Sequence, residues 1–177
     1  GSGQGGPQDS GGNGWPGDED LTNLLDGNTE NASVIEFDFI PLATTLSFRF
    51  IMASEEYDAL AEFPFYYECN YSDVFGFFLT HPDGTITNLA VIPDTDIPIA
   101  ITNIHPANDL CEAANPEYFG AYIPEGEGPI AYDGFTRAFT AQAEVIQGQS
   151  YNIKLAVADA TDNILDSAVF IEAGSFD

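Results

Sequence analysis

The chain has 177 residues and carries 29 Asp and Glu against 3 Lys and Arg, which gives a formal net charge of −26. With 44% hydrophobic and 13% aromatic residues it can form the core of one ordinary domain, so the composition excludes global disorder. Nucleic-acid binding is excluded because phosphate contacts need basic side chains, and no apolar run approaches the roughly 20 residues of a transmembrane segment.

The first 17 residues are rich in glycine and nearly devoid of apolar side chains. This composition predicts a flexible lead-in over residues 1–17, followed by a single domain over residues 18–177. Trp15 is the exception in the lead-in, and we expect it to pack back onto the body. Farther along, Leu24 and Leu25 could form a single helical turn.

From residue 34 onward, apolar and polar side chains alternate as they do in β-strands. Ile35, Phe37 and Phe39 are predicted to share one face of the first strand, and residues 46–53 repeat the pattern. Further strands are predicted over residues 73–80, 87–92, 97–104, 134–141, 151–158 and 167–173. Because no segment has the length and period of a substantial helix, the sequence predicts an all-β antiparallel sandwich, jelly-roll-like, with long loops over residues 54–72 and 105–133.

Acidic residues gather in three clusters, at residues 18–20, 54–58 and 159–166. Ca²⁺ takes 6–8 oxygen ligands from carboxylates, carbonyls and water, and loops at the end of a sheet can converge to supply them. No cluster has the spacing of an EF-hand loop, so a calcium site would have to be assembled from several loops. Zinc fits poorly because His81 and His105 are isolated.

Each acidic cluster also has a simpler interpretation. Asp18 and Asp20 could cap a helical turn, and Glu55 and Glu56 could be solvated loop acids. The overall acidity could equally be an adaptation to a salty exterior, where salt screens the repulsion between surface carboxylates.

The loop after residue 54 is crowded with aromatic side chains. Tyr57, Tyr66 and Tyr67 are candidates for contact with an external ligand such as a sugar or a protein partner. The alternative is that these rings cover one end of the sandwich beside Cys69.

The chain has two cysteines, Cys69 and Cys111, separated by 42 positions. An even count in a chain that looks extracellular favours one disulfide, although a pair of buried thiols is also compatible with it. Neither cysteine has the basic surroundings of a catalytic thiol.

The sequence offers little for catalysis, and we predict that the protein is not an enzyme. Glu55 and Glu56 could serve a glycosidase, but acids are so abundant that choosing a pair is close to arbitrary. No G-x-S-x-G motif accompanies His81 or His105.

Six motifs, in order, resemble the choice-of-anchor L domain family of bacterial secreted and cell-surface proteins. They are GDEDL at 17–21, VIEFDF at 34–39, FIMASEEY at 50–57, SDVFGFF at 72–78, YDGFT at 132–136 and the segment 153–176. The resemblance implies an extracellular, surface-associated protein without enzymatic activity, and it places Cys69 and Cys111 at the family's cysteine positions, which supports the disulfide. The family motifs contain the acids that we predict as calcium ligands: Asp18, Asp20, Glu55, Glu56, Asp73, Asp159 and Asp166.

The sequence therefore predicts a calcium-binding, non-enzymatic module that binds a surface glycan or a protein ligand, as in adhesion. The resemblance also suggests an alternative, because family members usually have further strands before the glycine-rich segment. A missing edge strand could be supplied by another copy of the chain, which would make the protein a self-assembling subunit of an extracellular filament. A carbohydrate-active enzyme is the third hypothesis.

Overall fold

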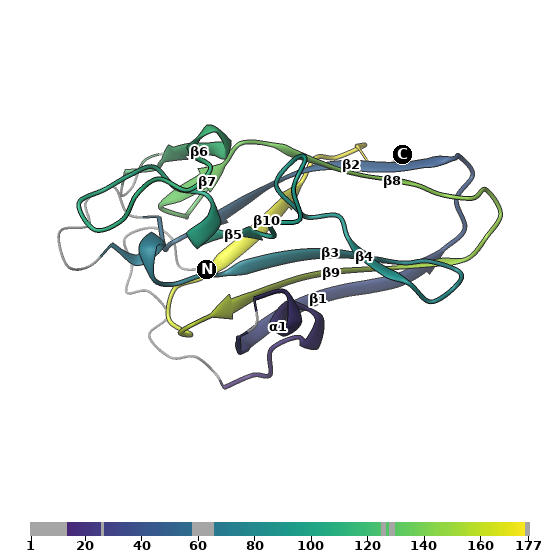
Figure 1. Cartoon of the computed structure of the whole chain (residues 1–177), viewed down its shortest axis with the longest axis horizontal. Helices are drawn as coiled ribbons and strands as arrows, with labels where there is room; N and C mark the ends of the chain where they lie inside the picture. Colours follow the sequence, from purple (N-terminus) through teal and green to yellow (C-terminus); the bar gives the residue numbers. More distant parts are fainter. Residues whose placement is uncertain (1–13, 26, 58–65, 125–126, 128–129, 176–177) are drawn as a thin grey trace.

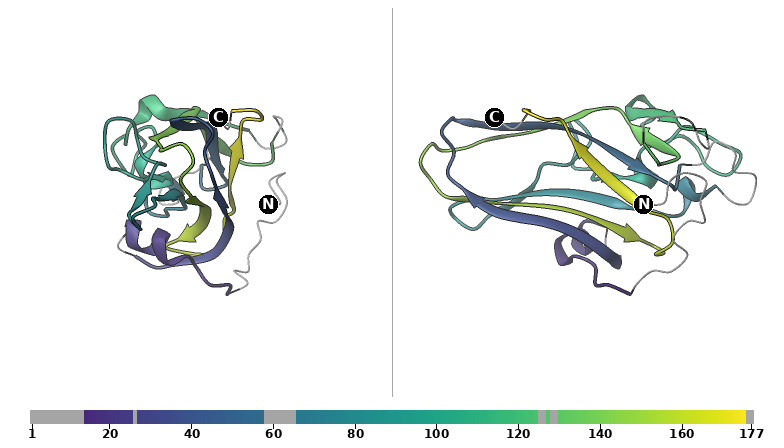
Figure 2. Two further views of the ribbon diagram at one scale, coloured as in Figure 1. Left: turned by 90° about the vertical axis from the view of Figure 1, so that its right-hand side faces the viewer. Right: turned by 180° about the vertical axis from the view of Figure 1, so that it is seen from behind.

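A computed structural model describes residues 14–25, 27–57, 66–124, 127 and 130–175. Two antiparallel β-sheets lie face to face along the length of the molecule (Figure 1 and, from behind, Figure 2). The first sheet has the order β1-β9-β3-β4, and β5 pairs with β3 beside β4. Its strands are β1 (Thr29–Phe39), β9 (Tyr151–Ala160), β3 (Val74–Thr80), β4 (Ile86–Asn88) and β5 (Ile99–Ala100).

The second sheet has the order β10-β2-β7-β6, and β8 also pairs with β2. Its strands are β10 (Ser167–Ile171), β2 (Thr45–Ser54), β7 (Gly134–Thr136), β6 (Phe119–Tyr122) and β8 (Phe139–Glu144). Strand β2 carries this sheet, because β8 pairs with its first half while β7 and β10 pair with its second half.

The helical elements are short: α1 (Glu19–Leu25) and the 3₁₀ turns η1 (Tyr67–Cys69), η2 (Ile101–Asn103) and η3 (Pro116–Tyr118). Helix α1 lies against the outer face of the first sheet, where it contacts β1, β3 and β9 (Figure 1). The side chain of Leu21 is fully buried there beside Val74 and Phe78. This small cluster gives the first sheet a covered outer face at that point.

The main core fills the space between the two sheets with aromatic side chains. Phe48 and Phe50 of β2 meet Phe77 and Phe75 of β3, with ring centroids 4.1 Å and 5.0 Å apart. Because side chains alternate along a strand, this pairing explains the apolar alternation predicted for β2. The predicted antiparallel sandwich is confirmed.

Several strand predictions need correction in detail. Residues 134–141 form two strands, since β7 ends at Thr136 and β8 begins at Phe139. Residues 97–104 contain only the two-residue strand β5 followed by η2, and β6 was not predicted. In β1, Ile35 and Phe37 are 63% and 40% exposed, because β1 is the outermost strand of its sheet.

The predicted lead-in is described only from Gly14 onward, and residues 1–13 lie outside the described residues. The described part pairs with the start of β1, where the carbonyls of Trp15 and Pro16 accept hydrogen bonds from the N–H groups of Asn31 and Ala32. The indole of Trp15 is 62% exposed. Its backbone, rather than its ring, holds this segment on the body.

Cys69 and Cys111 form the predicted disulfide, with their Cα atoms 6.0 Å apart. The bond ties η1 to the long segment that precedes β6. Asn108 lies beside it and donates to Glu68 Oε1 at 3.1 Å. The two predicted long loops are thus tied to each other by a disulfide and by a side-chain hydrogen bond.

Candidate cation site

The ends of four strands bring two of the acidic clusters together. Strand β2 ends at Ser54, opposite the first residue of β10, and the first residue of β3 lies opposite Ala158, near the end of β9. The residues that follow β2, precede β3 and follow β9 therefore meet at one end of the sandwich. They include Glu55, Glu56, Asp73 and Asp166. With Asp159, which is the next-to-last residue of β9, this end holds five of the seven predicted calcium ligands.

Glu56 and Asp73 lie at the centre of this group, and neither side chain is exposed. The backbone N–H of Asp73 donates to Glu56 Oε2 at 3.2 Å. The other three carboxylate oxygens, Glu56 Oε1 and both oxygens of Asp73, accept no hydrogen bond from the described residues. Buried polar atoms are nearly always paired, so three unpaired oxygens on two adjacent acids call for an explanation.

The loop between β9 and β10 is fixed to the end of β2 by a reciprocal pair of hydrogen bonds. Asp166 donates its N–H to Glu55 Oε2 at 3.3 Å, and Glu55 donates its own N–H to the Asp166 carbonyl at 3.1 Å. Glu55 and Asp166 thus have a structural role in holding the loop over the buried acids. Asp159 is fixed separately, by the side-chain amide of Asn31, which donates to Asp159 Oδ2 at 2.8 Å.

The electrostatic environment disfavours the charged form of the buried acids. Burial raises the pKa of Glu56 well above its ordinary value, and the negative charge of Asp73 raises it further. Burial likewise raises the pKa of Asp73; the Ser167 hydroxyl lowers it by a smaller amount, and the negative charge of Asp159 raises it by less again. At Asp159, burial raises the pKa to about 6. A positive charge at this end of the sandwich would reverse these effects.

The protein has few cationic side chains that could balance the buried acids. Its only Lys and Arg side chains are Arg49, Arg137 and Lys154, and within the described residues none forms an ion pair with Glu56 or Asp73. Arg49 pairs with Glu172 at 2.7 Å on the surface. The buried acids must therefore be balanced by protons or by a cation from solution.

The described residues do not form a ready-made metal cage, since no three His, Cys, Asp or Glu side chains among them converge closely enough to hold an ion. Glu56 and Asp73 are the two acids that come together. Calcium accepts carbonyl, hydroxyl and water oxygens as well as carboxylates. The hydroxyl of Ser167, which lies close enough to Asp73 to lower its pKa but forms no hydrogen bond of good geometry with the described residues, is one such oxygen.

Asp18 and Asp20 lie elsewhere, at the start of α1. Asp18 Oδ1 accepts the backbone N–H groups of Asp20 and Leu21 at 3.0 Å and 3.2 Å, as a helix cap does. The ammonium of Lys154 contacts both carboxylates, with 2.9 Å to Asp18. The charges of Asp18 and Asp20 are therefore already balanced by Lys154, unlike those of Glu56 and Asp73.

The predicted ligand-binding tyrosines are placed differently from one another. Tyr57 is fully buried in the core, and its hydroxyl donates to the carbonyl of Ile104 at 2.8 Å. Its ring is therefore not available to an external ligand. Tyr66 and Tyr67 are half-buried, and the ring of Tyr67 lies 5.9 Å from that of Tyr71, as in the alternative where aromatic residues cover the end of the sandwich.

The sequence model of the choice-of-anchor L domain matches residues 1–177, the whole chain. The protein belongs to the choice-of-anchor L domain family. This family is bacterial and surface-associated, and it is not a known enzyme family. No curated protein and no solved structure matches the chain. None of the helices in the described part of this choice-of-anchor L domain is long and apolar enough to cross a membrane.

Sequence reasoning missed two polar residues of this choice-of-anchor L domain that contact or adjoin the acids, Asn31 and Ser167. Asn31 adopts a left-handed conformation, with φ of 51°, at an irregularity of β1 between Glu30 and Ser33. Asn tolerates this conformation better than most residues. An Asn just before the alternating run was the available signal, whereas Ser167 could not be distinguished from any other strand residue.

Proposed function

We propose that this choice-of-anchor L domain is a calcium-binding ligand-recognition or adhesion module, with Ca²⁺ held between Glu56 and Asp73 and with Asp159 near it. The observation that carries the proposal is the set of three carboxylate oxygens without hydrogen-bond donors on two fully buried side chains. Removing a carboxylate from water is costly unless a cation or several donors replace the water. A divalent cation supplies that compensation to both acids at once.

Protonation of Glu56 and Asp73 is the competing explanation, and it explains fewer of the observations at this end of the sandwich. Each protonated carboxyl group offers one donor, and protonation of Glu56 and Asp73 would leave the negative charges of Asp159 and Asp162 unbalanced. Calcium binds several oxygens in flexible geometry, whereas magnesium requires a near-ideal octahedron and keeps much of its water. Each bound Ca²⁺ also makes the formal net charge of −26 less negative by two units.

The ligand-recognition part of the proposal is supported by where the site lies. The long segments between strands gather at this end of the sandwich, and loops on a rigid sheet scaffold commonly carry binding residues. The family is surface-associated, so such an end would face partners outside the cell. Calcium would hold these loops in one arrangement, which lowers the entropic cost of binding a ligand.

The test is thermal unfolding in calcium, in magnesium and in EDTA at one ionic strength. A ligand that binds only the folded state adds about 2.7 kcal/mol at 100 times its Kd. For a domain of this size, the midpoint should therefore rise by about 5–10 °C in calcium. An absent shift, or an equal shift with magnesium, would rule out a specific calcium site.

A variant with Glu56→Gln and Asp73→Asn should lose the calcium response. The matched control carries Asp96→Asn and Glu144→Gln, which removes the same charge from exposed positions. We expect the control to respond to calcium as the unmodified chain does. If both variants lost the response equally, general electrostatic attraction would explain the binding.

A further inference from the structure

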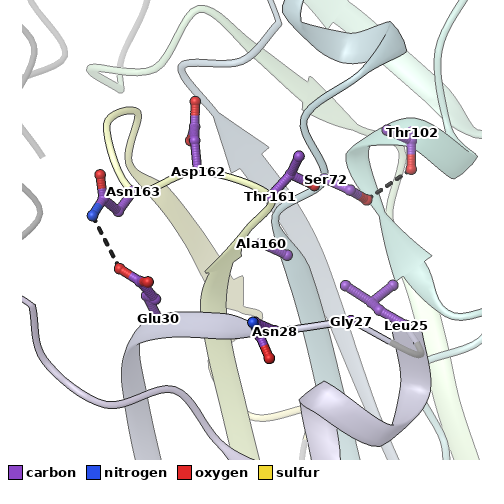
Figure 3. Close-up of a pocket in the computed structure, with 10 residues that line it drawn as sticks. All are labelled: Leu25, Gly27, Asn28, Glu30, Ser72, Thr102, Ala160, Thr161, Asp162 and Asn163. Carbon is purple, nitrogen blue, oxygen red and sulfur yellow. Dashed lines mark hydrogen bonds between the residues drawn. The ribbon is translucent and has the colours of Figure 1, made fainter.

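A polar pocket of about 610 Å³ opens beside the buried acids. Figure 3 shows its lining, with the Glu30–Asn163 pair on one side and the Ser72–Thr102 pair on the opposite side. The Asn163 amide donates to Glu30 Oε2 at 3.0 Å, and the hydroxyls of Ser72 and Thr102 lie 2.7 Å apart. The volume lies within the ordinary range for small-ligand sites.

The charge of this pocket narrows the class of ligand. Two of its lining residues, Glu30 and Asp162, carry carboxylates, and none of the chain's three Lys and Arg residues lines it. An anionic ligand such as a phosphate, a sulfate or an acidic sugar would be repelled. The Asp162 carboxylate also adds to the unfavourable negative charge at Glu56, Asp73 and Asp159, so a cation in the pocket would stabilise the whole group.

The shape of the pocket and its other lining residues narrow the class of ligand further. No aromatic ring lines the pocket among the described residues, so the stacking surface that commonly holds a sugar ring is missing. The half-buried Leu25 forms an apolar part of the wall, against which the methylene stem of a long basic side chain can pack. The hydroxyls and amides supply acceptors for several N–H donors.

We propose that this pocket binds a guanidinium or ammonium group, with Glu30 and Asp162 as its charged partners and the Ser72–Thr102 hydroxyls as further acceptors. The group would come from an Arg or Lys side chain of a partner protein or from a free polyamine. Guanidinium binding is favoured where two carboxylates and neutral acceptors surround one planar fork of donors. This proposal concerns the ligand of the proposed recognition module, and it does not depend on whether calcium occupies the neighbouring acids.

The experiment titrates the intact chain with small probes at about 0.15 M salt, once with saturating calcium and once with EDTA, and follows amide chemical shifts by NMR. The probes are the blocked amino acid amides of arginine and lysine, with those of citrulline and norleucine as uncharged counterparts of similar shape. We expect shifts confined to residues around the pocket with the two charged probes and none with the uncharged ones. Equal binding of the uncharged probes, or tighter binding of a neutral monosaccharide, would overturn the proposal.

The Glu30→Gln and Asp162→Asn double variant should raise the Kd of the arginine probe by about tenfold or more. The Asp96→Asn and Glu144→Gln double variant removes the same net charge and should leave the Kd within about twofold. An equal loss in both variants would overturn the proposal, because the binding would then reflect net charge alone. Displacement of the arginine probe by calcium would assign the pocket to the metal and would overturn it as well.

The calcium site and the pocket for a basic group can be rejected independently of each other. A calcium-dependent rise in the unfolding midpoint without probe binding would reject the basic-group pocket and leave the calcium site. Probe binding without a calcium response would do the reverse. A spermidine titration identifies the source, since a polyamine site should bind spermidine far more tightly than the single amino acid amides.

Discussion

Asp73 is the residue on which the proposed function depends most directly. Its carboxylate is fully buried without a hydrogen-bond donor, so without a metal its charge opposes folding. Asp73→Asn keeps the shape and removes the charge. In EDTA at neutral pH the variant should be more stable than the unmodified chain, by about 1–3 kcal/mol, whereas in saturating calcium it should be less stable.

Urea unfolding in the two conditions measures this reversal of sign. Urea is the appropriate denaturant because guanidinium chloride would change the ionic strength and would itself supply the proposed ligand of the adjacent pocket. Asp96→Asn, at an exposed position, should change stability by less than about 0.5 kcal/mol in both conditions. A loss of stability in both EDTA and calcium would argue that Asp73 has only a packing role.

Asp159 leads to a prediction about pH. Its pKa is raised from 3.8 to about 6 in the folded chain, so between these values the folded state binds more protons than the unfolded state. The free energy of unfolding should therefore fall as pH rises through this window, and the raised pKa values of Glu56 and Asp73 act in the same direction. Calcium favours the ionised carboxylates and should flatten or reverse this dependence.

The measurement is the unfolding midpoint in EDTA and in calcium at about pH 5 and at neutral pH, at constant ionic strength. In EDTA the midpoint should be higher at the lower pH. Asp159→Asn should reduce the slope because it removes one of the groups that titrate. A midpoint in EDTA that rises with pH would contradict the assigned direction of all three pKa shifts.

At the scale of single elements, the attachment of α1 to the first sheet depends on Lys154. Lys154 lies in β9, and its ammonium binds the carboxylates of Asp18 and Asp20. All three side chains are mostly shielded from water. Lys154→Met should destabilise the chain by about 2–4 kcal/mol, because it leaves two acids without their cation. Arg49→Met is the matched control: its ion pair with Glu172 is about half exposed, so we expect a loss under about 1 kcal/mol.

Urea unfolding compares the two variants, and hydrogen exchange at α1 locates the effect. Amide protons of Glu19–Leu25 should exchange faster in the Lys154→Met variant alone. If the two methionine variants lost the same stability, the burial of the Lys154 pair would have no energetic importance.

How far the fold could be predicted varies among the elements. Strands β2 and β9 were predicted well, because both lie inside their sheets and their side chains alternate between two environments. Strand β1 shows the limit, since the alternation of Ile35 and Phe37 marks a face but not whether another sheet covers it. The break between β7 and β8 falls where their pairing with the same edge of β2 shifts register by one residue, from Ala53 opposite Phe135 to Phe50 opposite Phe139, which is a tertiary property.

The candidate site was predictable to a similar extent. The charge pattern picked out Glu55, Glu56, Asp159 and Asp166, while the choice among acids required knowing which of them are buried and unpaired. Asp18 and Asp20 have the same local pattern, and Lys154, which is 134 positions beyond Asp20, neutralises them. Contacts across such separations are set by strand register and cannot be read from local sequence.

At the scale of the whole molecule, the disulfide joins the two long loops, residues 54–72 and 105–133, to each other. Cys69 and Cys111 are 42 positions apart, and a link of that span contributes about 4 kcal/mol in the loop-entropy description. Reduction, or a variant with Cys69→Ala and Cys111→Ala, should lower the unfolding midpoint by about 10 °C.

Calorimetry with and without reductant measures the effect, and the double-alanine variant should not respond to reductant. Because the bond joins η1 to the loop before β6 and neither cysteine is a proposed calcium ligand, the reduced chain should keep its calcium response at temperatures below the new midpoint. Loss of the calcium response on reduction would show that the loop must be closed for the acids to be held in place.

The segment before α1 has an optical consequence. Trp15 is the only tryptophan, and its backbone N–H donates to Asn31 Oδ1 at 3.3 Å, while the other end of the same amide donates to Asp159. Loading of the proposed calcium site near Asp159 should therefore be transmitted through Asn31 to the backbone of Trp15. The intrinsic fluorescence of this single ring should follow metal loading in solution, so the protein carries its own label-free indicator for the site.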